Sequence, residues 1–170
     1  MSEEMLPLFD RFGIDAASAA QVLERALAKG GDYADLFFEY RVDGAMSLDD
    51  GKVDDVRRSV HLGLGIRVLA DQATGYAYTE DLSLAGMLRA ASTAGAIAAG
   101  RGATRGISVE GVAALDLYPI ERPAIDVEAV EKLELLRRAE RAALDYDDRI
   151  VRVRASLGES VKEILVVTSD

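Results

Sequence analysis

The chain has 170 residues, with 20 Lys and Arg against 30 Asp and Glu, so its formal net charge is -10. This length predicts one globular domain, or one with a short appendage, that can bury enough surface to fold without a disulfide or a metal. It has no Cys and one His, which excludes thiolate zinc sites and a cysteine nucleophile and fits the reducing cytoplasm. The surplus negative charge argues against nucleic acid as a partner. The most apolar long stretch, 82–99, is Ala-rich and contains Arg89, so we expect no membrane segment.

The first predicted elements are a helix and an antiparallel meander. The helix is capped by Asp15 and ends at Gly30-Gly31, because apolar residues between them recur at helical spacing. From Tyr33 the period changes to two, which predicts a strand. Asp43-Gly44 and Asp50-Gly51 are hairpin signals, so we expect two turns and short antiparallel strands around them.

A third strand region ends in residues 61–70, where the even-numbered apolar residues share a face. Gly63 and Gly65 share the opposite face and leave a flat strip that another backbone or helix could approach closely. Residues 76–79 predict a fourth strand. A helix capped by Ser83 and rich in small residues follows.

The rest of the chain begins with a long connector, 101–125, which contains several Gly and Pro residues and no sustained period. Asp126 can cap a highly charged helix that runs to about Leu144. Two strands, 150–157 and 161–168, then flank a predicted turn at Gly158.

The resulting order, α-β-β-β-β-α-α-β-β, groups strands in neighbouring runs. It predicts an α+β fold in which a mainly antiparallel sheet packs against helices. The last strand runs almost to Asp170, where a further turn and strand are normally found, so we expect the chain to be part of a longer one.

Residues that could carry chemistry are few. His61 stands alone, which favours a half-exposed strand residue over a metal ligand. Four carboxylates crowd one hairpin: Asp49, Asp50, Asp54 and Asp55. A calcium loop would need a Glu six residues after its Gly, and Arg57 stands there, so we favour a solvated turn over an acid/base pair. A hydrolase that uses these four carboxylates is kept as a lower-ranked alternative.

Other motifs are also incomplete. Gly63-Leu64-Gly65 lacks the third Gly of a dinucleotide fingerprint and lies inside a strand. No serine elbow is present, so a serine triad is not expected. Arg101 and Arg105 in the connector could hold a carboxylate or the acidic face of a partner, and the alternative is solubilising charge.

Three segments carry a resemblance to a known family. They are DYADLFFE at 32–39, GIRV at 65–68 and TGYAYTEDLS at 74–83, the last followed by the Ala-rich helix. Their order and spacing resemble the amino-terminal domain of the TldD/PmbA proteins, also called modulators of DNA gyrase. The resemblance spans about residues 15–170, and the third segment is more similar to the TldD branch than to the PmbA branch.

This resemblance implies a zinc metallopeptidase that cuts peptides and unfolded or modified polypeptides, as a homodimer or as a TldD/PmbA-type heterodimer. In that family a His-Glu-x-x-x-His helix of the carboxy-terminal domain holds the metal. No such motif occurs here, so no catalytic or metal residue is carried over, and the expected cofactor of this chain alone is none.

We therefore expect residues 1–170 to be a single non-catalytic amino-terminal domain, inactive alone and cytoplasmic, without the catalytic carboxy-terminal domain. Its parts are 15–100, the loop 101–125, and the helix with two strands at 126–170. It would form a subunit interface and wall the substrate chamber. The candidate contacts with substrate or partner are Gly63, Gly65, Arg67, Tyr76, Tyr78, Arg101 and Arg105. The alternative is a stand-alone protein-interaction module that binds a peptidase partner without catalysis.

Overall fold

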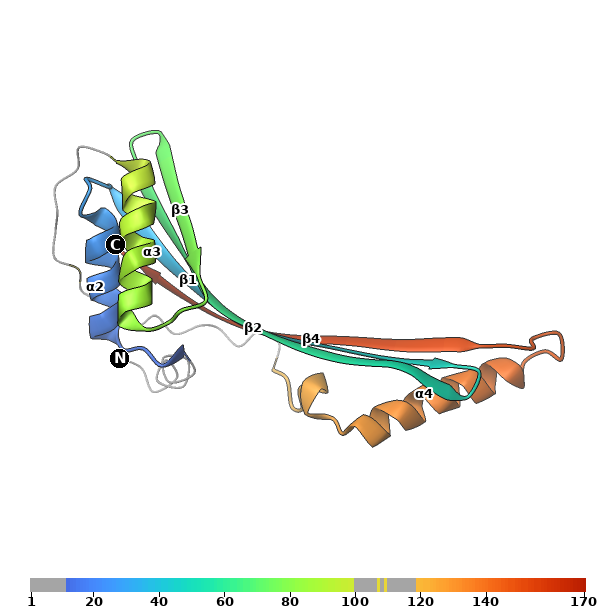
Figure 1. Ribbon diagram of the computed structural model, residues 1–170. Helices are drawn as coiled ribbons and strands as arrows, with labels where there is room; N and C mark the ends of the chain where they lie inside the picture. Colours follow the sequence, from blue (N-terminus) through green and yellow to red (C-terminus); the bar gives the residue numbers. More distant parts are fainter. Residues whose placement is uncertain (1–11, 100–106, 108, 110–118) are drawn as a thin grey trace. The chain divides into compact units, whose positions relative to one another are not determined.

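The computed structural model describes residues 12–99, 107, 109 and 119–170. In chain order its elements are α2 (Ala16–Leu27), β1 (Tyr33–Asp49), β2 (Lys52–Ala70), β3 (Ala73–Thr79), α3 (Leu84–Ala98), the 3₁₀ turn η1 (Ala124–Asp126), α4 (Ala129–Leu144) and β4 (Arg154–Thr168) (Figure 1). The strands form one antiparallel sheet in the order β3-β2-β1-β4. The predicted α+β class, with its alternation of helices and runs of strands, is confirmed.

The chain divides into two compact units. Unit 1 comprises the described residues of Met1–Tyr40, Leu62–Leu115 and Glu163–Asp170, and unit 2 those of Arg41–His61 and Asp116–Lys162. The strands β1, β2 and β4 contribute residues to both units. None of the described helices is long and apolar enough to span a membrane.

In unit 1, α2 and α3 lie side by side against one face of the sheet (Figure 1). Both helices start as predicted, because the side chain of Asp15 accepts a hydrogen bond from Ser18 N at 2.7 Å and that of Ser83 accepts one from Gly86 N at 3.1 Å. Helices and strands share one apolar core. Its largest fully buried side chains are Val22, Leu23, Leu27, Leu36, Phe38, Leu64, Ile66, Val68 and Met87. Each contributes about 1.5–3 kcal/mol of burial free energy.

In unit 2, α4 packs on β1 and β4 through a small apolar cluster. Met46, Leu48 and Leu136 are buried there, and Leu133, Ala155 and Leu157 pack around them. A buried ion pair joins α4 to β4, with Lys132 Nζ 2.6 Å from Glu159 Oε1.

Of the two predicted hairpin turns, only the second exists. Asp50 and Gly51 have φ values of 51° and 75°, the left-handed pair that a two-residue hairpin turn requires. The turn predicted at Asp43-Gly44 is wrong, since β1 continues through it. Gly44 instead makes room for a side chain from the neighbouring strand, because a Cβ there would lie 2.8 Å from Glu159 Cγ.

The turn predicted at Gly158 is also wrong, because β4 is one continuous strand. Its pairing with β1 holds it extended: Ser169 N donates to Ala34 O at 3.0 Å beyond one end, and Asp50 N donates to Val153 O at 3.1 Å beyond the other.

The last helix begins later than predicted. Asp126 ends η1, and Val127 has an extended backbone, so α4 starts only at Ala129 with Glu128 in the cap position. The predicted connector 101–125 lies outside the described residues except for residues 107, 109 and 119–125.

Candidate interaction surface

Five of the seven candidate contact residues lie on β2 and β3, on the sheet face of unit 1 that points away from α2 and α3. They are Gly63, Gly65, Arg67, Tyr76 and Tyr78, which alternate with core residues such as Leu64 and Ile66. The structure thus brings them together on one face. Arg101 and Arg105 lie outside the described residues.

The two tyrosines fill the glycine strip. In the β2/β3 register Gly65 pairs with Tyr78 and Arg67 with Tyr76. A Cβ at Gly63 would lie 2.7 Å from carbon atoms of the Tyr78 ring, and a Cβ at Gly65 would lie 2.7 Å from the Tyr76 hydroxyl. The expectation that another backbone or helix approaches this strip is therefore wrong: rings of the adjacent strand already cover it, as aromatic residues do beside strand glycines.

Next to the rings lies an ion pair that the sequence pattern did not predict. Arg67 binds the carboxylate of Asp35 through Nε at 2.8 Å and Nη2 at 2.6 Å. Asp35 is buried while Arg67 is half-exposed, so the pair fixes the guanidinium at the surface. Asp35 raises the pKa of Arg67. Burial, and then the charge of Asp35, raise the pKa of the neighbouring Tyr33 hydroxyl.

The same face exposes large apolar side chains from three strands. Phe37 on β1, Tyr76 and Tyr78 on β3, and Ile164 and Val166 on β4 are each 39–59% exposed. Together with the Asp35–Arg67 pair they form what we call the open face. Exposed apolar side chains that gather on one face of a sheet are typical of protein interfaces. Rings, aliphatic side chains and a guanidinium that is already paired with a carboxylate are groups well suited to bind a protein surface.

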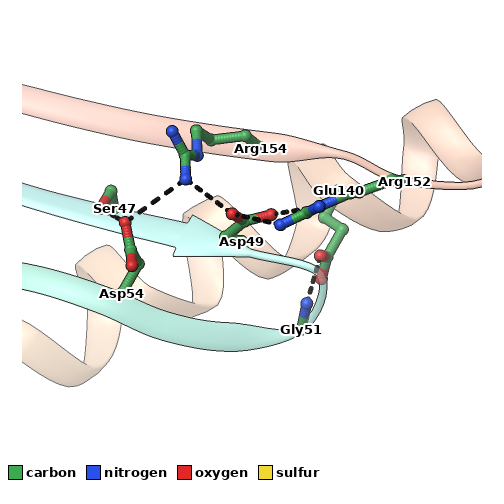
Figure 2. A network of polar contacts seen from close by, with 7 residues as sticks. All are labelled: Ser47, Asp49, Gly51, Asp54, Glu140, Arg152 and Arg154. Carbon is green, nitrogen blue, oxygen red and sulfur yellow. Dashed lines mark hydrogen bonds and ion pairs between the residues drawn. The ribbon is translucent and has the colours of Figure 1, made fainter.

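The acidic hairpin is exposed at its turn, where Asp50 and Gly51 lie, while Asp49 belongs to an ion-pair network (Figure 2). Asp49 accepts hydrogen bonds from Arg152 at 2.9 and 2.8 Å and from Arg154 at 2.7 Å. These guanidinium groups lower the pKa of Asp49 from 3.8 to about 2. A carboxylate that stays ionised and fully paired is a poor acid or base near neutral pH. The network therefore does not support the hydrolase alternative.

The turn at the tip of this hairpin is held by α4. Glu140 is buried and accepts a hydrogen bond from Gly51 N at 2.6 Å, as Figure 2 shows. Within the described parts of the chain, no group of three or more His, Cys, Asp or Glu side chains is placed to hold a metal ion. His61 is exposed on β2.

The Asp49 network predicts a pH-dependent loss of stability. Because folding lowers the pKa of Asp49, its contribution is fully present above its unfolded pKa and is lost as the pH falls from about 4 towards 2. We expect Asp49→Asn to destabilise the chain at pH 6, and the difference from wild type to shrink between pH 4 and pH 2. Urea unfolding at several pH values measures this. A difference that stays constant over that window would contradict the assignment.

Two family models match different parts of the chain. Residues 34–98 match the model described as PmbA/TldA metallopeptidase domain 1, and residues 122–170 match the PmbA/TldA metallopeptidase central domain.

Curated relatives are similar over most of the chain. It is 29% identical over 150 residues to the metalloprotease TldD homolog of Buchnera aphidicola subsp. Acyrthosiphon pisum, covering 87% of this chain and 31% of that protein. It is 30% identical over 144 residues to the metalloprotease TldD homolog of Haemophilus influenzae, covering 82% and 29%. The chain thus spans about a third of the length of these relatives.

Solved structures share the fold. A proposed modulator of DNA gyrase from Bacteroides thetaiotaomicron matches with a TM-score of 0.68 at 18% identity, over 90% of this chain and 36% of that one. A second, from Thermotoga maritima, matches with 0.68 at 16% identity, over 90% and 35%. TldE from Thermococcus kodakarensis matches with 0.57 at 14% identity, over 88% and 34%. At these identities the likeness concerns the fold alone.

Proposed function

The chain belongs to the PmbA/TldD metallopeptidase family, and from this premise we propose that it is the non-catalytic amino-terminal part of a TldD-type zinc metallopeptidase. In this role it lines the chamber that admits peptides or unfolded polypeptides and contributes to the contact between subunits. The open face carries the proposal, because it presents five exposed apolar side chains on a sheet whose other face is already filled by α2 and α3.

The residues of this chain do not fit a catalytic zinc ion. Such a site needs about three protein ligands, commonly with imidazole among them, and the whole sequence has one His and no Cys. We therefore derive no catalytic step from this chain. The proposal places the zinc in the part of the peptidase that follows it, and places the assembly in the cytoplasm. It includes no direct contact with DNA, because the net charge of -10 opposes one.

Complementation tests the proposal. We would coexpress the chain with the portion of the Haemophilus influenzae relative that lies beyond the matched region, and then purify any complex. The expected result is a stable complex that cleaves an unstructured peptide, while the chain alone binds less than one equivalent of zinc and cleaves nothing. Stoichiometric zinc in the isolated chain would refute the proposal. A complex without cleavage would favour the stand-alone interaction module.

We expect the open face to contribute most of the binding free energy of that complex. We expect Tyr76→Ala/Tyr78→Ala to weaken the complex at least about tenfold, since exposed tyrosines at interfaces are frequent hot spots. Isothermal titration of the purified components measures the change. The matched control is Tyr146→Ala, a tyrosine of unit 2 that is 85% exposed, which should leave the affinity unchanged. Equal effects of the two variants would remove the open face from the interface.

A further inference from the structure

In unit 2, one edge of β2 carries no strand in the part of the chain that the structure describes. The partner on that side, β3, pairs only with residues Leu64–Ala70. Among the described strands, β1 is therefore the one neighbour of β2 over residues 52–61. Val53, Val56 and Val60 are 47%, 59% and 56% exposed along this stretch. A long exposed edge offers unpaired backbone N–H and C=O groups to another strand.

The charges along this edge are complementary to those of a second copy that runs in the opposite direction. The sequence is Asp54-Asp55-Val56-Arg57-Arg58. If a second copy pairs antiparallel with Val56 opposite Val56, Asp54 lies opposite Arg58 of the second copy and Asp55 lies opposite its Arg57. The two-fold symmetry repeats both pairs, so all four charges of each copy face an opposite charge. Opposite charges directly across a strand pair stabilise it, and like charges destabilise it.

Neighbouring registers are disfavoured by the same charges. Sliding one strand by two residues in one direction places Asp55 opposite Asp55, and in the other direction Arg57 opposite Arg57. A parallel, in-register pairing places each charged residue opposite the same residue of the second copy. Charged residues on an edge strand commonly prevent indiscriminate pairing, and here they leave one favourable arrangement.

The four charged side chains are accessible to a second copy, and Asp54 is 51% exposed although it also lies 3.7 Å from Arg154. Asp55 and Arg57 form an exposed ion pair within the chain at 2.6 Å, with 40% and 76% of their side chains accessible, and Arg58 is also exposed. Beside them, Val56, Arg57 and Arg58 border a groove of about 480 Å³ that is also lined by Asp126 and Glu128. The segment 54–58 itself carries two acidic and two basic residues, so it is neutral although the chain as a whole is strongly acidic.

We propose that two copies of this chain associate through their β2 edges, antiparallel and centred on Val56, to form a sheet that continues from one copy into the other. This inference names one surface of the subunit contact that is part of the proposed function. The biological role of the dimer rests on that proposed function, but the existence of the dimer does not. Self-association is measured on the chain alone, without a peptidase partner or substrate. Either proposal can therefore fail while the other stands.

Charge reversal within the Asp55 and Arg57 pair tests it, because these residues lie apart from the Asp49 network. In the dimer, positions 55 and 57 of the two copies face each other. Asp55→Arg therefore creates two Arg–Arg pairs across the strands, and Arg57→Asp creates two Asp–Asp pairs. We expect each variant to raise the dimer dissociation constant at least about tenfold in sedimentation velocity experiments. An equimolar mixture of the two variants restores every opposite-charge pair, and so does the double variant Asp55→Arg/Arg57→Asp. Both should dimerise about as tightly as wild type.

The matched control is Glu134→Arg, which breaks an ion pair of similar exposure with Arg141 on α4 and should not alter dimerisation. Circular dichroism melting confirms that each variant is folded. The proposal is overturned if the wild-type chain stays monomeric up to the order of 100 μM, a concentration at which even a weak micromolar dimer would form. It is equally overturned if the reversal variants associate as wild type does, or if mixing them restores nothing. A monomer that captures extended peptides along this edge would show that the edge serves another strand.

Discussion

Replacing Gly75 by Ala is expected to lower the free energy of unfolding by about 3 kcal/mol, the upper part of the range for an overpacked site. A Cβ at Gly75 of β3 would overlap the carbonyl oxygen of Ala94 and lie 2.7 Å from Ala98 N, and both atoms belong to the backbone of α3. The helix cannot retreat easily, because a Cβ at Gly95, on its α2 side, would overlap the carbonyl oxygen of Ala26. Urea unfolding followed by circular dichroism measures the loss.

Gly158→Ala is the matched control, since it adds the same methyl group to a strand glycine. A Cβ there meets no atom within 4 Å, so the free energy of unfolding should stay the same or rise by up to about 1 kcal/mol as the unfolded chain loses freedom. If both variants lost equal stability, the close approach of β3 and α3 would not be the cause.

Local signals predicted most of the framework. The caps of α2 and α3 and the left-handed turn at Asp50-Gly51 depend on residues within a few positions of each other, so the sequence alone could locate them. The inward face of β2 followed in the same way from a strict period of two.

What failed depends on residues distant in sequence. The local sequence around Gly44 and Gly158 predicts turns, yet both residues lie inside long strands. The space that Gly44 leaves is filled by Glu159, a residue of a strand that follows much later in the chain. No local pattern shows which side chain occupies the space above a glycine, so turn and strand could not be distinguished.

For the same reason, the sequence predicted only part of the candidate surface. Tyr76 and Tyr78 were expected to be contact residues and are exposed on the open face, but the sequence does not say that their rings cover Gly63 and Gly65. The Asp35–Arg67 pair was missed as well. Alternation does place Asp35 on the outward face of its strand, which is the one signal that could have identified it.

Replacing Lys132 by Met is the second substitution with a large expected effect. In wild type, Lys132 Nζ lies 2.6 Å from Glu159 Oε1, with only 12% and 8% of the two side chains exposed. Glu159 Oε2 is already buried without a hydrogen-bond partner among the described residues. Without the ammonium group, the carboxylate would be buried and uncompensated, so we expect a loss of about 3–5 kcal/mol in the free energy of unfolding. Urea unfolding at pH 7 measures it.

A double variant separates the missing charge from altered packing. Lys132→Met/Glu159→Met removes both charges and keeps similar volume over Gly44, so it should recover most of the stability that the single variant loses. The exposed pair between Glu134 and Arg141 gives the matched comparison: Arg141→Met should cost at most about 1 kcal/mol, because half-exposed ion pairs contribute little. If Lys132→Met cost no more than Arg141→Met, water would have to reach Glu159 in solution. The contact of α4 with β4 would then depend on the apolar cluster around Leu136 rather than on the ion pair.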